Sequence, residues 1–257
     1  MQIQHEKTQD EVIQALQRRV DELTAANLLL QEQLARKEQF TAMVAHELRG
    51  PLAPIINYAQ MAARPGQHSE SIQRGTKIIV GQARRLVRLV NDLLDASRLS
   101  SGQFTLIREA CDIVALTREV VEQLRPVAPY HTLALELPSR PFIGNWDSGR
   151  LQQALGNLLD NALKYSDEHT TITVRVVPVG NAVHISIHNH GTSIPSTYTS
   201  QLFRPFVRLP ATNERQGSGL GLHITKSIVE AHGGTLRLEP HAGEEQGTTF
   251  SFDLPLN

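Results

Sequence analysis

Apolar residues recur every seven positions along residues 12–44, in two series that lie three residues apart. The first series is Ile13, Val20, Asn27 and Leu34, and the second is Leu16, Leu23 and Leu30. β-Branched residues in one series and leucine in the other are typical of a parallel two-stranded coiled coil, in which a buried asparagine fixes the register. Lys37 interrupts the second series, but Val44 resumes it. The pattern therefore favours a coiled coil over the alternative, a single amphipathic helix packed on a globular core.

The helical pattern continues to about Ala63 and is followed by a second helix over about 70–98. Pro65 and Gly66 predict a turn between the two helices. In the second helix the apolar heptad positions are Ile72, Ile79, Leu86 and Leu93. A helical hairpin with one apolar stripe cannot bury that stripe alone, so two copies are expected to form a four-helix bundle.

After residues 100–102 the pattern changes to short strands alternating with helices. Strands are expected over 103–107, 132–138, 141–146, 171–178, 182–189, 234–240 and 248–255, with 132–138 and 141–146 flanking a turn. Asp112 and Asp147 are expected to cap helices reaching Leu124 and Tyr165, and a third helix is expected over 219–232. The glycine–asparagine pair at 180–181 predicts a hairpin. This half of the chain is therefore predicted to be a two-layer α/β sandwich.

Composition narrows the class of protein. The 257 residues suffice for two modest domains, and a net charge of −1 gives no basic surface for nucleic acid. The single cysteine, Cys111, excludes an internal disulfide and fits a reducing compartment; beside an apolar run, it is expected to be packed and inert. No stretch approaches the ~20 apolar residues of a membrane span, and the polar N-terminus is unlike a secretion signal. We expect a cytoplasmic protein.

One face of the helix expected over 147–165 carries candidate chemistry. Asn157, Asn161 and Lys164 are spaced i, i+4 and i+7, which places them on one side of a helix. A carboxamide oxygen suits magnesium, and a lysine beside it can pair with phosphate. The alternative, a solvated polar stripe, is the favoured interpretation when this helix is taken alone.

A glycine-rich stretch at 215–225 opens the last expected helix. Gly217, Gly219 and Gly221 allow backbone N–H groups to approach a ligand, and a helix N-terminus attracts anions. The stretch is not a P-loop, because no GK[ST] follows, and it lacks the strand–loop–helix unit of a Rossmann fingerprint.

Six motifs, in order along residues 39–257, resemble the catalytic core of sensor histidine kinases. HELRGPL (46–52) resembles the phosphoacceptor box and NLLDNALKY (157–165) the asparagine box. HNHGTSIP (188–195), GSGLGL (217–222) and GTTF (247–250) resemble the three glycine boxes, and LFRPFVR (202–208) the phenylalanine box. Each motif alone is weak evidence, but six in this order are specific.

The resemblance implies a dimerising phosphotransfer bundle followed by a gyrase-like, Bergerat-type ATP-binding fold. Residues 1–38 would be the coiled-coil signalling helix, 39–101 the dimerisation and phosphotransfer hairpin, and 102–257 the ATP-binding domain. A homodimer would phosphorylate itself on His46 with ATP and pass the phosphoryl group to an aspartate of a response-regulator receiver domain.

The resemblance also implies roles for individual residues. Glu47 would act as general base, Pro51 would bend the helix beyond the histidine, and Asn161 would bind magnesium. The other nucleotide-binding positions carried over are Asn157, Lys164, Tyr165, Asn189, Gly191, Arg208, Arg215, Gly217, Ser218, Gly219, Leu220, Gly221 and Thr248.

Three positions depart from the family pattern. Asn189 replaces the aspartate that reads the adenine amine, Ser193 replaces the second glycine of that box, and Gly50 replaces a threonine or asparagine associated with phosphatase activity. A pseudokinase scaffold that lost ATP binding through Asn189 and Ser193 is therefore the alternative function, although the intact Asn161 and Lys164 argue against it. A gyrase-like ATPase or serine kinase is a third, which the HELRGPL hairpin disfavours.

Histidines outside the phosphoacceptor box give no metal site. His184 and His188 lie four positions apart on one expected strand, ~13 Å from each other, which is too far for one metal. We expect both to face solvent. HELRG is not a zinc-protease motif, because Gly50 stands where that motif has its second histidine.

Overall fold

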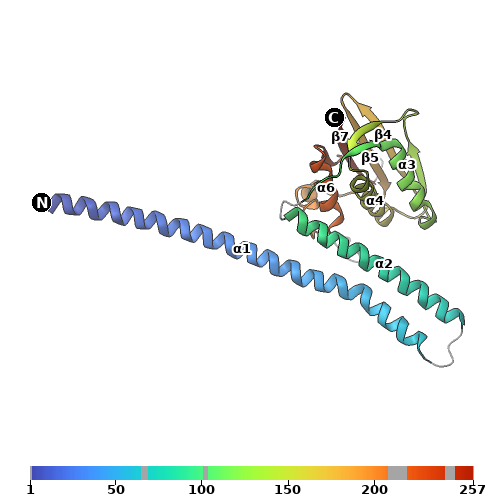
Figure 1. Cartoon of the computed structure of the whole chain (residues 1–257), viewed down its shortest axis with the longest axis horizontal. Coiled ribbons are helices and arrows are strands. Elements are labelled where there is room, and N and C mark those ends of the chain that lie inside the picture. Colours follow the sequence, from blue (N-terminus) through green and yellow to red (C-terminus); the bar gives the residue numbers. More distant parts are fainter. Residues whose placement is uncertain (1, 65–68, 101–103, 208–218, 241–246, 257) are drawn as a thin grey trace. The chain divides into compact units, whose positions relative to one another are not determined.

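The computed structural model describes residues 2–64, 69–100, 104–207, 219–240 and 247–256 (Figure 1). The chain divides into two compact units, Met1–Leu86 and Val87–Asn257, and the division falls within the second helix. Across the described residues, none of the helices combines the length and the apolar character that crossing a membrane requires.

The first unit is helical, as predicted. Helix α1 runs unbroken from Gln2 to Ala62 and passes through Pro51 and Pro54. Helix α2 (Ser69–Ser100) follows, and the turn predicted between them lies largely outside the described residues. Gly75 of α2 is buried against the ring of Tyr58 of α1, where an added Cβ would lie 3.4 Å from the ring. The two helices of the hairpin therefore pack directly on each other at this point.

The second unit is an α/β sandwich, which confirms the predicted fold class. Its strands are β1 (Glu109–Asp112), β2 (Thr132–Glu136), β3 (Ile143–Trp146), β4 (Thr171–Val179), β5 (Ala182–His190), β6 (Thr235–Leu238) and β7 (Gly247–Pro255). Its helices, after the end of α2, are α3 (Ile113–Leu124), η1 (Arg125–Val127), α4 (Ser148–Tyr165), η2 (Ser196–Tyr198), α5 (Thr199–Leu202) and α6 (Gly221–Ala231).

Five strands form the main sheet in the order β2-β4-β5-β7-β6. Only β2 and β4 are parallel; the other neighbours are antiparallel, including the predicted β4–β5 hairpin around Gly180. Alternate residues of β5 are buried, and these pack with the apolar faces of α3, α4 and α6 into one core. The period-2 strands and the period-3.6 helices thus share a single apolar layer.

Two predicted helix caps are confirmed. The Asp112 side chain accepts from Val114 N at 3.1 Å, and that of Asp147 accepts from Arg150 N at 3.0 Å. Each carboxylate therefore satisfies an N–H group that the first helical turn leaves without an intrahelical partner.

One strand prediction is wrong. The described part of 103–107 is not a strand: Ile107 N instead donates to the Asp147 carboxylate at 2.8 Å, and the first strand is β1, four residues on from Thr105. The strands predicted over 132–138 and 141–146 are confirmed as β2 and β3, but they do not pair with each other. β2 joins β4 in the main sheet, whereas β3 joins β1 in a separate two-stranded sheet.

The expectation that His184 and His188 face solvent is also wrong in part. Both lie on the sheet face opposite the helices, but they are half-buried by neighbouring strands. His184 Nδ1 lies 2.8 Å from the Asp253 carboxylate, and His188 Nδ1 lies 2.8 Å from the Thr249 hydroxyl. Cross-strand partners on β7 therefore cover them.

Candidate functional site

The HELRGPL segment (46–52) lies within α1. The His46 side chain is 79% exposed, whereas that of Glu47 is only 13% exposed. His46 Nδ1 lies 3.7 Å from Glu47 Oε1, which is within ion-pair range but longer than a hydrogen bond. The imidazole is thus open to a reaction partner on one side and faces a carboxylate on the other.

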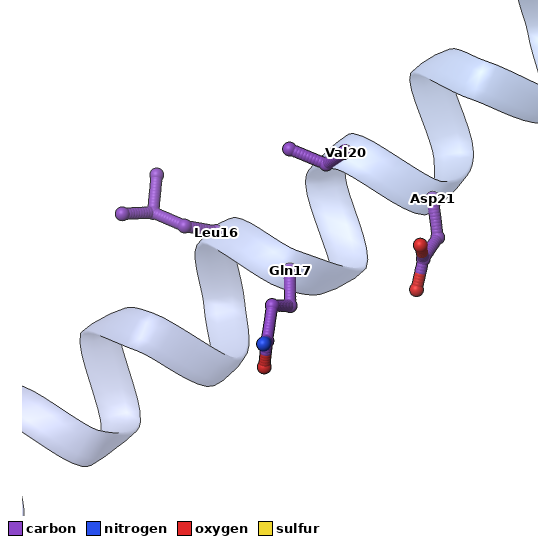
Figure 2. Close-up of a pocket in the computed structure, with 4 residues that line it drawn as sticks. All are labelled: Leu16, Gln17, Val20 and Asp21. Atoms are coloured by element: carbon purple, nitrogen blue, oxygen red, sulfur yellow. The ribbon is translucent and has the colours of Figure 1, made fainter.

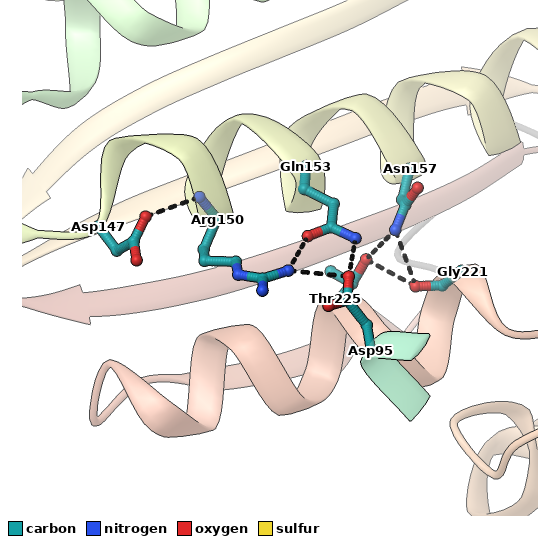
Figure 3. A network of polar contacts seen from close by, with 7 residues as sticks. All are labelled: Asp95, Asp147, Arg150, Gln153, Asn157, Gly221 and Thr225. Carbon is teal, nitrogen blue, oxygen red and sulfur yellow. Dashed lines mark hydrogen bonds and ion pairs between the residues drawn. The ribbon is translucent and has the colours of Figure 1, made fainter. Parts of the chain in front are cut away.

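The predicted polar face of α4 forms one wall of a second site, in the α/β unit. Asn157 is not solvated: its Nδ2 donates to Gly221 O at 3.3 Å and lies 3.5 Å from the Thr225 hydroxyl, so that it joins α4 to the start of α6 (Figure 3). Asn161, one turn later, is half-buried and its side chain makes no hydrogen bond to another described residue. Lys164 lies over the Tyr165 ring, with Nζ 4.8 Å from the ring centroid.

The end of β5 is fixed to the end of α4. Ser166 Oγ donates to His190 O at 3.1 Å, and Ser166 forms an isolated β-bridge with Gly191. Gly191 has φ +154° and lies so close to Tyr165 O that an added Cβ would collide with it. A glycine is therefore required here by sterics, since any side chain would push the two segments apart.

Two polar side chains sit on the helix-facing side of the sheet beside this junction. Asn189 is 3% exposed and Thr248 is 6% exposed, and they are paired across β5 and β7. Among the described residues, Asn189 Nδ2 makes only a long contact of 3.5 Å to His190 O, and Thr248 Oγ1 donates to Thr192 O at 3.3 Å. A buried carboxamide without a short hydrogen bond is unusual, and it fits a group that awaits a ligand.

The described end of the glycine loop leads into α6. Gly219 has φ +69° and its carbonyl accepts from Phe206 N at 2.9 Å, while Phe206 itself has φ +67°. Leu220 is fully buried, and within the described part of the chain no side chain caps the helix that begins at Gly221. The first N–H groups of α6 can therefore serve an anion. Of the predicted site residues, Arg208, Arg215, Gly217 and Ser218 lie outside the described residues.

Within the α/β unit these elements converge on one site. The structure brings together the side chains of α4, the end of β5, the start of β7 and the N-terminus of α6. Magnesium usually takes one or two protein ligands together with substrate phosphates. Asn161 lies one helical turn beyond Asn157, which contacts the start of α6, so its amide suits a magnesium–nucleotide pair. The sequence reasoning missed Ser166 and Thr225, which hold the site together; serine and threonine at helix ends are too common to be a signal.

Burial shifts the pKa of three groups around this unit. Burial raises the pKa of the Cys111 thiol, which keeps it protonated. Burial also lowers the pKa of His232, whose Nε2 accepts from Asp147 N at 3.0 Å. Asp92, near the end of α2, has its pKa raised to about 6 by burial and then by Asp95, against the opposing effect of Arg88.

Comparison with known proteins agrees with this geometry. Residues 36–102 match the family described as His Kinase A (phospho-acceptor) domain, and residues 146–257 match the histidine kinase-, DNA gyrase B- and HSP90-like ATPases. The chain is 34% identical over 245 residues to the probable sensor histidine kinase TcrY of Mycobacterium tuberculosis, which covers 95% of this chain and 51% of TcrY. The chain thus spans about half the length of that relative.

Two solved structures are also similar. Full-length ShkA in complex with AMPPNP has a TM-score of 0.62 and 27% identity, covering 83% of this chain and 45% of ShkA. Histidine kinase ThkA in complex with the response regulator protein TrrA has a TM-score of 0.64 and 24% identity, covering 88% of this chain and 64% of that one. The second likeness is one of fold.

Proposed function

Because the chain carries the catalytic core of the histidine kinase family, we propose that it phosphorylates itself on His46 with ATP and then passes the phosphoryl group to an aspartate of a response-regulator receiver domain. The observation that carries this proposal is the exposed His46 ring, whose Nδ1 faces the Glu47 carboxylate at 3.7 Å. The receiver as partner is supported by the family, and the structurally similar ThkA was solved with a response regulator.

The position of Glu47 selects the nitrogen that reacts. A neutral imidazole carries one proton, and a carboxylate beside Nδ1 favours the tautomer with that proton on Nδ1. Nε2 then keeps its lone pair and attacks the γ-phosphorus of ATP. The new P–N bond forms as the P–O bond to ADP breaks, and the Nδ1 proton passes to Glu47.

The site in the α/β unit would hold the nucleotide. Asn189 would contact the adenine. Backbone N–H groups at the start of α6, with Gly219, Leu220 and Gly221, would contact the phosphates. By family position Asn157, Lys164, Tyr165, Gly191, Arg208, Arg215, Gly217, Ser218 and Thr248 would complete this site. Magnesium, when bound through Asn161, neutralises charge on the phosphates.

We further propose that residues 1–38 form a parallel coiled coil, 39–101 a dimerising hairpin and 102–257 the ATP-binding domain. The support is a row of exposed apolar side chains on α1: Leu16 is 60% exposed, Val20 59%, Leu23 58% and Leu30 63%. Figure 2 shows Leu16 and Val20 projecting from one side of the helix while Gln17 and Asp21 project from another. A second copy of the chain would bury this row.

The test is incubation with γ-labelled ATP and magnesium, followed by acid treatment. We expect an acid-labile, alkali-stable label on His46, no label on His46→Gln with ATP binding retained, and labelling slowed by ~10² or more in Glu47→Ala. Asn161→Ala should weaken binding of magnesium–ATP more than binding of metal-free ADP.

Two results would contradict this proposal. A full label on His46→Gln would move the phosphorylation site elsewhere. Absence of ATP binding by the unaltered chain at millimolar nucleotide would instead indicate a dimeric signalling scaffold, the alternative that rests on Asn189 and Ser193.

A further inference from the structure

The last turns of α2 pack into the same core as the sheet. Ala96 is 5% exposed, and Leu93 and Leu99 pack against the buried residues of the α/β unit. Asp95 lies among them with its side chain only 8% exposed. A carboxylate in such a position is costly unless it is paired and hydrogen-bonded.

Asp95 is held by two residues of α4. Its Oδ2 accepts from Arg150 Nη1 at 2.8 Å and from Gln153 Nε2 at 2.8 Å, and the same Arg150 nitrogen donates to Gln153 Oε1 at 2.9 Å (Figure 3). The Arg150 guanidinium also lies over the Phe104 ring, 4.9 Å from its centroid. We call Asp95, Phe104, Arg150 and Gln153 the clamp, because they join α2, α4 and the segment that precedes β1.

The clamp and the nucleotide site share one face of α4. Arg150, Gln153 and Asn157 are spaced i, i+3 and i+7, so they follow each other along the helix. Asn157 then bonds to Gly221 at the start of α6. One helix therefore carries the attachment of α2 near its N-terminus and the contact with the start of α6 near its middle.

A second ion pair joins the same two helices without these properties. Arg88 Nη1 lies 3.9 Å from Asp160 Oδ2, but the two side chains are 71% and 55% exposed. Exposed pairs of this kind contribute little, so this pair is a matched control for the clamp.

We propose that Asp95 and Arg150 are positioning residues for phosphoryl transfer, which fix the end of α2 on α4 so that the ATP-binding domain is oriented by α2. The inference rests on the proposed function, because transfer from ATP to His46 is the reaction they serve. A reaction between two parts of a chain needs one relative orientation, and a loosened attachment adds unproductive orientations. None of the clamp residues is among the proposed nucleotide contacts, so loss of the clamp should lower kcat and leave the KM for ATP unchanged.

The experiment uses the full chain and three variants: Asp95→Asn, Arg150→Lys and the control Arg88→Gln. Asn keeps the shape of Asp95 but removes its charge. Lys keeps the charge of Arg150 but removes the planar guanidinium that lies over the Phe104 ring. Initial rates of His46 labelling against ATP concentration give kcat and KM. Hydrogen exchange over residues 93–99 reports the attachment of α2 without relying on catalysis.

We expect roughly tenfold lower kcat in both clamp variants, with KM within about twofold of the unaltered chain and faster exchange at 93–99. Arg88→Gln should leave kcat, KM and the exchange at 93–99 unchanged. Faster exchange with an unchanged kcat would overturn the proposal and leave the clamp a purely structural contact, and so would a raised KM at unchanged kcat. If one clamp variant does not fold, judged by its thermal melt, the other carries the test. Failure of the unaltered chain to become labelled from ATP would contradict the proposed function itself. This result is seen before any variant is compared, so the two failures are distinguishable.

Discussion

Leucines on α1 and on α4 meet opposite environments within one chain. Leu23 and Leu30 on α1 are 58% and 63% exposed, whereas Leu155 and Leu158 on α4 are fully buried. The sheet and its helices thus bury their own apolar residues. The long helix cannot, because a narrow apolar seam on a single helix has no surface of its own to pack against. The difference indicates that the α/β unit is stabilised within the chain, and it supports the proposal that a second copy covers the exposed leucines of α1.

The largest expected effect is on the α/β unit, which buries its own apolar residues within the chain and which we call the self-contained half. Leu155→Ala should lower the free energy of unfolding of the α/β unit by about 2–5 kcal/mol, since it removes buried methyl groups and leaves a cavity. Because the core lies within one chain, the resulting fall in melting temperature should be the same at every protein concentration. Calorimetric melts over a hundredfold range of concentration measure this.

The matched change on α1 is Leu23→Ala. It should leave the melt of the α/β unit unchanged and shift the dimer–monomer equilibrium toward monomer, as seen by sedimentation at micromolar concentrations. An unaltered chain that is monomeric, or a Leu23→Ala variant that melts lower by the same amount at every concentration, would favour the alternative of an amphipathic helix packed on its own chain.

Local signals explain which predictions were right. Asp112 and Asp147 precede apolar helical patterns, and both act as caps because an N-cap needs only residues within three positions. The β4–β5 hairpin followed from Gly180 for the same reason.

The exposed pair Leu28 and Leu29 on α1, 59% and 60% exposed, falls outside both series of the heptad, and nothing in the described residues explains it.

Errors arose where distant segments decide the structure. Residues 103–107 alternate like a strand, but their described part meets Asp147 rather than another strand. β2 and β3 lie close in sequence and join different sheets, because each pairs with a strand that sequence separation does not identify. In the site, spacing placed Asn157 on the correct face of α4, yet only its partner Gly221 distinguishes it from a solvated stripe. The clamp joins Asp95 to Arg150 across 55 positions, which no local pattern predicts.

Two titrating groups of the second unit have opposite effects on its stability as the pH falls. The Asp92 carboxyl has a folded pKa of about 6 against an ordinary 3.8. Between these values the folded state binds the proton and the unfolded state does not, so this group favours folding as pH falls from 7 to 5. His232 has a folded pKa below its ordinary 6.5, so the stability it contributes is present above 6.5 and is lost as pH falls from 6.5 through the lower folded pKa.

A substitution of Asp92 isolates its contribution from that of His232. Asp92→Asn should stabilise the α/β unit at pH 7 by on the order of 1 kcal/mol, allowing for solvent screening of a half-exposed group, and should have a smaller effect at pH 5. Melting temperatures from pH 5 to 8 provide the measurement. A melt of the α/β unit that is indifferent to Asp92→Asn at every pH would mean that the end of α2 is not part of its cooperative unit.

The smallest expected effect concerns Asn189, which lies wholly in the self-contained half and should therefore act equally at any protein concentration. The adenine amine is a donor. A hydrogen bond to a charged acceptor contributes roughly 1.5–3 kcal/mol and a neutral one roughly 0.5–1.5. Asn189→Asp should thus bind ATP more tightly by about 1 kcal/mol, a several-fold change.

The same substitution should destabilise the chain when no nucleotide is present. Asn189 is 3% exposed and makes only a 3.5 Å contact to His190 O, so a carboxylate in its place would be buried without a partner. The Asp variant is therefore expected to melt lower than the unaltered chain without ATP and to gain more from added ATP. Titration calorimetry with ATP and with GTP, on the unaltered chain, Asn189→Asp and Asn189→Ala, measures the affinities directly. Loss of ATP binding in the Ala variant would fit a direct contact, whereas equal affinity of the unaltered chain for GTP and ATP would show that Asn189 does not read the base.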